Sequence, residues 1–177
     1  MLFRSGTILT WLAVVPLAGA VPGDLRLVDA ARRQDKQAVR ALLKQQVDVN
    51  ATQADGASAL AWAVHWDDLE TAELLMRVGA KVNASNELGV TPLMLSSVNG
   101  SATMVAALLR AGADPNLGRP SGETALVLAA RAGSVPVVKL LLASGANVNA
   151  KTKAGEDRKS TRLNSSHIQK SRMPSSA

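Results

Sequence analysis

A spacing of 33 residues recurs along the middle of the chain and limits the folds that the chain can adopt. Three independent series of turn-forming residues share this spacing, which chance does not explain. A period of this length is typical of a solenoid, in which each structural unit packs only against its neighbours. The three series are Gly56, Gly89, Gly122 and Gly155; Gly79, Gly112 and Gly145; and Asn50, Asn83, Asn116 and Asn149.

Each period contains signals for two short helices and a projecting turn. Thr91 and Thr124 stand where a hydroxyl can cap the first helix, and Pro92 suits a first helical turn. Leu and Val supply an apolar stripe on both helices, while small Ala or Ser on the first helix lets neighbouring units approach closely. Gly79 and its equivalents end the second helix, where a left-handed residue is needed. The Asn residues and the Gly residues that follow them suit tight hairpin turns.

These motifs resemble those of ankyrin-repeat proteins, in particular the exported bacterial type. Thr91-Pro92-Leu93-Met94 matches the T-P-L-H motif of the family, and Gly145-Ala146-Asn147-Val148-Asn149 matches its G-A-D-V-N motif. The resemblance covers Asp24 to Glu156 and implies an all-α fold, a solenoid of stacked helix pairs with short β-hairpin loops. The motif's His is replaced throughout, by Ala61, Met94 and Val127, so we expect packing to carry more of the stability. Asp67 replaces a turn glycine, which predicts a less regular turn there.

The repeat spacing divides the chain into segments. The polar run from Arg32 to Asp35 favours a terminal cap for the first unit. We expect the array to be truncated after Glu156, with part of the apolar surface at 137–142 exposed and self-association through this uncapped end. The expected segments are a signal peptide (1–20), an N-terminal capping repeat (24–53), three ankyrin repeats (54–86, 87–119 and 120–152), the start of a truncated repeat (153–156) and a disordered, artefactual tail (157–177).

The N-terminal residues have the order of a secretory signal peptide. Arg4 precedes an apolar stretch at 7–15, Pro16 breaks the helix, and Ala18-Gly19-Ala20 forms an A-x-A cleavage site. The apolar stretch is shorter than the ~20 residues that span a bilayer. The sequence therefore predicts an exported protein, periplasmic or secreted, that is not bound to a membrane in its mature form. The alternative is an uncleaved membrane anchor.

The C-terminal residues 157–177 are rich in Ser and Arg and lack apolar periodicity. They resemble one translated reading frame of a common sequencing-library adapter. The alternative is a natural basic tail that binds nucleic acid. Without this tail and Arg4, the net charge of +6 falls to +1, because 14 basic and 13 acidic side chains remain. A nearly neutral body predicts no nucleic-acid partner.

The composition also restricts chemistry. The chain has no Cys and two His residues, His65 and His167, neither with ligands at metal-binding spacing. Neither a nucleophile triad nor a phosphate-binding loop is visible. We therefore predict a scaffold that binds an unknown partner protein through the concave ankyrin face, without catalysis, metal or cofactor. The alternative function is the N-terminal ankyrin segment of a truncated, larger exported enzyme or cytochrome.

The resemblance implies where a partner would bind, since ankyrin contacts come from residues beside the turn glycine and from the end of the first helix. Trp66, at an outward position beside Leu88, is the main candidate anchor, because aromatic residues dominate binding energy. Its alternative role is packing against its neighbours. Trp62 falls at a core leucine position and is assigned to the interior. The predicted partner-binding residues are His65, Trp66, Glu87, Leu88, Val90, Asn99, Glu123 and Arg131.

Overall fold

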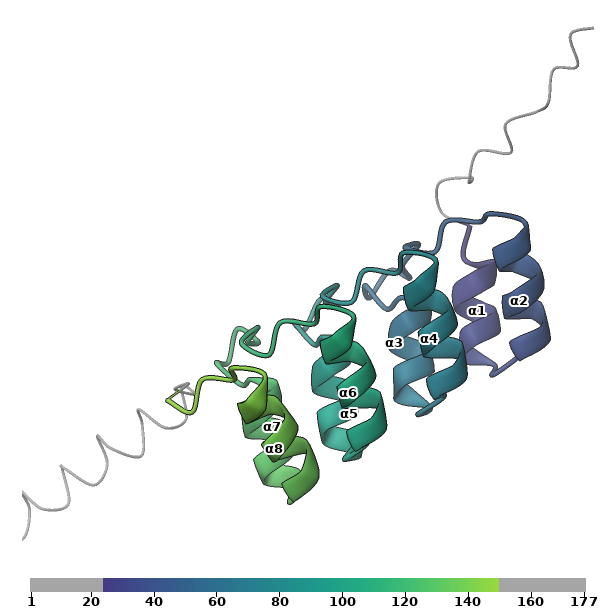
Figure 1. Cartoon of the computed structure of the whole chain (residues 1–177). Helices are drawn as coiled ribbons and strands as arrows, with labels where there is room; N and C mark the ends of the chain where they lie inside the picture. The colour runs from purple at the N-terminus through teal and green to yellow at the C-terminus, as the bar shows by residue number, and fades with distance from the viewer. Residues whose placement is uncertain (1–23, 150–177) are drawn as a thin grey trace, which may run out of the picture.

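The computed structural model describes residues 24–149, which contain eight helices and no strand. The predicted signal peptide, truncated repeat and adapter-like tail lie outside these residues. Figure 1 shows the helices as four pairs standing side by side in chain order. The all-α solenoid expected from the repeats is therefore confirmed. The helices are α1 (Arg26–Arg32), α2 (Lys36–Lys44), α3 (Ala59–His65), α4 (Leu69–Arg77), α5 (Pro92–Asn99), α6 (Ala102–Arg110), α7 (Ala125–Ala132) and α8 (Val135–Ala143).

Side chains cap the first turns of most of these helices. The Thr91 hydroxyl accepts a hydrogen bond from the Met94 N–H at the start of α5, and Pro92 fills the first turn, as predicted. The prediction for Thr124 is wrong, because its Oγ1 is buried and has no hydrogen-bond partner among residues 24–149. With Val127 in place of the motif's His, that hydroxyl also lacks the imidazole that the family pattern would supply there.

A left-handed residue turns the chain between the two helices of each pair. Gly100 and Gly133 hold this position with φ of 71° and 72°, and Asp67 holds it with φ of 53°. The expectation of a less regular turn at Asp67 is wrong, since the Asp68 N–H donates to the Ala63 carbonyl at 2.9 Å, as happens in the glycine-containing turns. Aspartate reaches this conformation at a small cost because its short polar side chain tolerates it.

The core runs through the stack as a continuous apolar layer. Leu75, Leu108 and Leu141, at one position of successive second helices, are completely buried. Small side chains line the contacts between first helices, where Ala63 and Ser96 are buried. The first helices α1, α3, α5 and α7 contact one another more extensively than the second helices do. Small residues therefore bring the first helices together, as predicted from the sequence.

The recurring asparagines join each unit to the next. The Asn83 side-chain amide donates to the Gly112 carbonyl at 3.1 Å, and its oxygen accepts from the Asp114 N–H at 2.9 Å. Asn50 and Asn116 make the same two bonds to the units that follow them. The asparagine series therefore links neighbouring units, a role that goes beyond the turn preference assigned from the sequence.

The hairpin loops project from one end of the helix pairs (Figure 1) and contain isolated bridges, Thr52 with Ser58 and Gly118 with Thr124. Gly56 turns the first loop with φ of 81°, and a Cβ there would lie 2.9 Å from the Cα of Asn86 in the next loop. The Glu87 N–H also donates to the Asp55 carbonyl at 3.0 Å. Successive loops are thus in direct contact through their backbones.

Ion pairs connect the second helices at the N-terminal end of the stack. The Lys36 amine lies 2.9 Å from Asp68 and 3.2 Å from Glu70, and Arg40 pairs with Glu70. Hydrogen bonds to Asp68 and Glu70 raise the pKa of Lys36, and those from Lys36 and Arg40 lower the pKa of Glu70. Burial acts to raise the pKa of Asp68, but hydrogen bonds from Lys36 and Thr71 outweigh it and lower this pKa.

Candidate protein-interaction face

The first helices and the hairpin loops together form one face of the stack, here called the inner face. Trp62, Leu95 and Leu128 occupy the same position of α3, α5 and α7, and each is half-buried against the core. They form a row of apolar side chains, one from each successive unit. Half-buried apolar side chains held on rigid helices suit a binding surface, because their conformations are fixed before a partner arrives.

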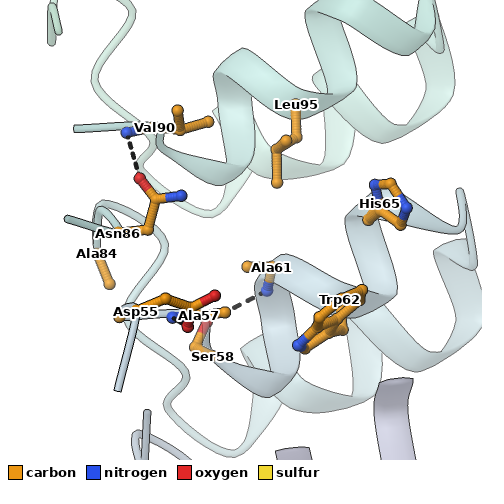
Figure 2. A pocket seen from close by; sticks show the side chains of 11 residues that line it. Asp55, Ala57, Ser58, Ala61, Trp62, His65, Ala84, Asn86, Val90 and Leu95 are labelled. Atoms are coloured by element: carbon orange, nitrogen blue, oxygen red, sulfur yellow. Dashed lines mark hydrogen bonds between the residues drawn. The ribbon is translucent and has the colours of Figure 1, made fainter. Parts of the chain in front are cut away.

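A groove opens in this row between the second and third helix pairs. It has a volume of about 200 Å³ and is mostly apolar. Figure 2 shows Ala61 and Trp62 of α3 on one side, with Leu95 of α5 and Val90 of the next loop on the other. The residues that line it are Asp55, Gly56, Ala57, Ser58, Ala61, Trp62, His65, Ala84, Asn86, Val90 and Leu95.

Local hydrogen bonds hold the polar groups of the groove in place. The Asn86 side-chain oxygen accepts from the N–H groups of Val90 at 2.9 Å and Leu88 at 3.1 Å. The Ser58 hydroxyl caps α3 by accepting from the Ala61 N–H at 3.2 Å (Figure 2). The Asp55 carboxylate accepts from the Ala57 N–H at 2.9 Å. The loops are therefore stiffened by their own side chains.

Aromatic rings form the end of the groove that lies away from the loops. The ring of His65 stands edge-on to that of Trp62, with centroids 5.6 Å apart. It also stands edge-on to Trp66, at 4.8 Å. The Trp62 indole N–H donates to the Gln53 side chain at 3.3 Å. His65 thus joins the two tryptophans into one cluster at the C-terminal end of α3.

The structure separates two residues that the sequence was expected to bring together. Trp66 is 45% exposed and its indole N–H donates to the Arg32 carbonyl of the preceding unit at 3.1 Å. Leu88 is 64% exposed at a loop tip, and its carbonyl accepts from Arg119 of the following unit at 3.3 Å. The Trp66 side chain therefore contacts the preceding unit, and the Leu88 backbone contacts the following one. Neither residue lines the groove. Of the predicted residues, only His65 and Val90 do.

Glu123 and Arg131, both predicted as contact residues, bind each other instead. The Arg131 guanidinium lies 2.6 Å from one Glu123 oxygen, and that of Arg119 lies 2.9 Å from the other. The Ser121 hydroxyl lies 3.3 Å from the same carboxylate. This cluster crosses the inner face at the fourth helix pair. A partner would meet it as a preformed ion-pair network with one more positive than negative charge.

The remaining predicted residues have structural contacts as well. The Asn99 amide donates to the carbonyls of Val64 at 3.1 Å and His65 at 3.3 Å, so it ties α5 to the end of α3. Glu87 has an exposed side chain, while its backbone N–H binds the loop before it. Asn99 is therefore a weaker candidate for partner binding than Glu87, because its amide is already engaged.

The assignment of Trp62 to the interior needs correction, because the residue is half-buried and lines the groove. The position itself lies at the edge of the core, since Leu95 and Leu128 are half-buried there as well. Trp62 and Leu95 were missed as site residues. The 33-residue spacing was the signal that could have found them, since it places both in one row with Leu128.

Other surfaces offer less. A hollow of about 360 Å³ between α4 and α6 is lined largely by Glu73, Arg77 and Arg110. These long charged side chains lose much conformational freedom when they are immobilised, which opposes tight binding. In α8, Leu142 is exposed, whereas Val137 and Leu141 are buried, so part of the apolar surface at 137–142 is exposed, as expected. Self-association through this end stays a prediction.

Residues 24–149 contain no group of three or more His, Cys, Asp or Glu side chains placed to hold a metal ion. None of their helices has the length and apolarity needed to cross a membrane. The inner face is thus the candidate site that the described residues support best.

Comparison with known proteins agrees with this architecture. No curated protein matches the chain. The family model for ankyrin repeats, described as three copies, matches residues 22–86 and 78–152, which together make up well over half of the sequence. Ankyrin repeats generally serve as protein-interaction modules, and the family is typically non-enzymatic. The four stacked helix pairs, their projecting loops and this match show that the chain belongs to the ankyrin-repeat family.

Proposed function

We propose that the chain binds a segment of another protein through its inner face, with the groove between Trp62 and Leu95 as the main contact. The observation that carries this proposal is the preformed apolar groove between α3 and α5. Aromatic side chains that sit at the centre of an interface supply a large part of its binding energy. The hydrogen-bonded loops reduce the entropy that binding would cost.

The proposed role is binding without catalysis. Ser58 carries the one hydroxyl that lines the groove, and it already serves as the cap of α3. His65 faces two indole rings, which fit a packing role for the imidazole. A partner would therefore be held by apolar contact and hydrogen bonding in the groove.

Selection from a displayed library of random peptides tests the proposal. Val90→Glu should abolish binding of the selected peptides, because it places a charge in the groove. The scaffold accepts a glutamate at this position, since Glu123 is its equivalent in the next unit. Val98→Arg is the matched control. Val98 lies outside the groove, and Arg131 is its equivalent in the next unit, so this variant should leave binding within about twofold, as expected for a peripheral exposed site.

Loss of binding in both variants, with both folded by circular dichroism, would argue against the groove as the contact. Equal binding by the wild type and Val90→Glu would refute the proposal. Thermal unfolding of each variant shows whether a lost interaction reflects a damaged fold.

We also propose that the chain is exported. The support is the order of Arg4, the apolar stretch at 7–15 and the Ala18-Gly19-Ala20 site. Expression in a bacterial host should yield a periplasmic product whose N-terminal sequence starts at Val21. A cytoplasmic product that begins at Met1 would contradict this.

A further inference from the structure

The charge on the groove is one-sided. Among its lining residues, Asp55 is the only Asp or Glu, and there is no Lys or Arg. Glu87 stands on the adjoining loop with an exposed side chain, and its backbone N–H binds the Asp55 carbonyl. Two carboxylates therefore occupy neighbouring loop tips beside an apolar groove.

Neither carboxylate is neutralised by the part of the chain that the structure describes. Within residues 24–149, no Lys or Arg lies within ion-pair distance of Asp55 or Glu87. Glu123, on the corresponding loop of the fourth pair, has two arginine partners. Within these residues, no basic side chain therefore pairs with Asp55 or Glu87, and a basic group of a partner would complement them.

The groove also has a surface suited to both parts of a basic side chain, its methylene groups and its charged end. Trp62 lies in the wall between Asp55 and His65 (Figure 2). Basic side chains lay their methylene groups along apolar surfaces while the charged end reaches a polar partner. An indole ring adds cation–π attraction, which is stronger with Trp than with other aromatic residues.

We infer that the groove takes an extended peptide segment in which Arg or Lys stands two positions from a bulky apolar residue, so that both side chains point to the same side. The apolar side chain lies between Val90 and Leu95, and the basic one crosses Trp62 toward Asp55. This inference rests on the proposed function and specifies the partner's chemistry. The complementary charge sets the specificity and the rate of encounter, while the apolar contact supplies the larger part of the affinity.

Two biased display libraries test it, one with an apolar residue two positions from Arg or Lys and the other with an apolar residue two positions from Asp or Glu. The basic library should enrich and the acidic library should not. Asp55→Asn should weaken the selected peptides about 2- to 5-fold, as expected for the loss of one exposed ion pair. The amide oxygen keeps the bond to the Ala57 N–H, so the loop remains intact. Glu73→Gln, an exposed acid on α4, is the control and should change nothing.

The outcomes separate the inference from the proposed function. Enrichment without a basic bias, or insensitivity to Asp55→Asn with retained sensitivity to Val90→Glu, overturns only the inference. Failure of both libraries to enrich overturns both. Self-association of the wild type that Val90→Glu abolishes would place a second copy in the groove and would also overturn the inference. A fall in affinity of the basic peptides as NaCl rises, with the fall reduced in Asp55→Asn, supports it.

Discussion

The region between the second and third helix pairs and the region between the third and fourth share one backbone design but present different surfaces. The turn bonds are alike, since the Gly89 N–H donates to Asn86 at 2.9 Å and the Gly122 N–H donates to Arg119 at 2.7 Å. The side chains differ. Asn86 binds its own loop, whereas Arg119 reaches the Leu88 carbonyl of the preceding loop and the Glu123 carboxylate.

This difference shows how a repeat scaffold acquires a distinct site. The positions that are Ala57 and His65 in the second unit are Glu123 and Arg131 in the fourth. Small or neutral side chains leave the groove open between the second and third pairs, while an ion-pair network spans the fourth. The backbone fixes where a side chain stands, and the residue chosen there decides whether the surface receives a partner or binds itself.

Substitutions at the turn glycines should lower the stability of the shared backbone the most. Gly56→Ala should lower the free energy of unfolding by about 2–4 kcal/mol, because Ala resists positive φ and its Cβ would meet the next loop's backbone. Gly89→Ala should cost about as much, since its Cβ would lie 2.8 Å from Pro120 Cδ, a ring atom bonded to the backbone nitrogen, and 3.3 Å from the Arg119 Cα. Urea unfolding followed by circular dichroism measures both.

Gly112→Ala is the control for that experiment. Its φ is 90°, yet a Cβ there would meet nothing within 4 Å. It should cost only the backbone strain, about 1–2 kcal/mol. A loss at Gly112 that equals the loss at Gly56 would show that contact between neighbouring loops does not contribute.

Substitution of the recurring asparagines tests whether the hydrogen bonds between units are equivalent in the two regions. Asn83→Ala and Asn116→Ala each remove two hydrogen bonds to the next unit. Each should cost about 1–2 kcal/mol, the worth of two partly exposed bonds. The two losses, measured by thermal unfolding, should agree to about 0.5 kcal/mol, within the range expected for equivalent sites. A much larger loss at one position would mean that the links are not equivalent.

The sequence predicted what depends on period and local chemistry. The helix pairs, the left-handed turn glycines and the small residues between first helices all follow from the 33-residue pattern. It did not predict that Trp62 would be half-buried, because the burial of this position depends on how neighbouring units pack, and Leu95 and Leu128 are half-buried there too. The direction taken by Trp66 was also missed, since it depends on the carbonyl of Arg32, a long-range contact that no local motif encodes.

Converting the fourth unit toward the second should change stability little. Glu123→Ala, with Ala57 as its natural counterpart, removes the partner of both Arg119 and Arg131. Arg131 is exposed and the Arg119–Glu123 pair is half-buried, so the expected loss is about 1 kcal/mol and decreases with salt. Thermal unfolding in low and high NaCl measures it. A loss that is larger and independent of salt would show that Glu123 contributes through packing.

The smallest effect concerns the ion pairs that join the first two helix pairs, a link that the groove region lacks. The pKa values of Asp68 and Glu70 are lowered in the folded chain, so their stabilisation is present above the unfolded values of about 4 and is lost as the pH falls through the folded ones. That of Lys36 is raised, so its contribution is present below about 10.4 and disappears as the pH rises through the folded value. Glu70→Gln should therefore lower the melting temperature slightly at pH 7 and leave it unchanged near pH 2. Glu73→Gln, whose carboxylate lies 3.9 Å from Arg77 within α4, is the control and should change the melting temperature at pH 7 less than Glu70→Gln does. If the Glu70→Gln difference persisted undiminished at pH 2, the stabilisation would come from the shape of the side chain and not from its charge.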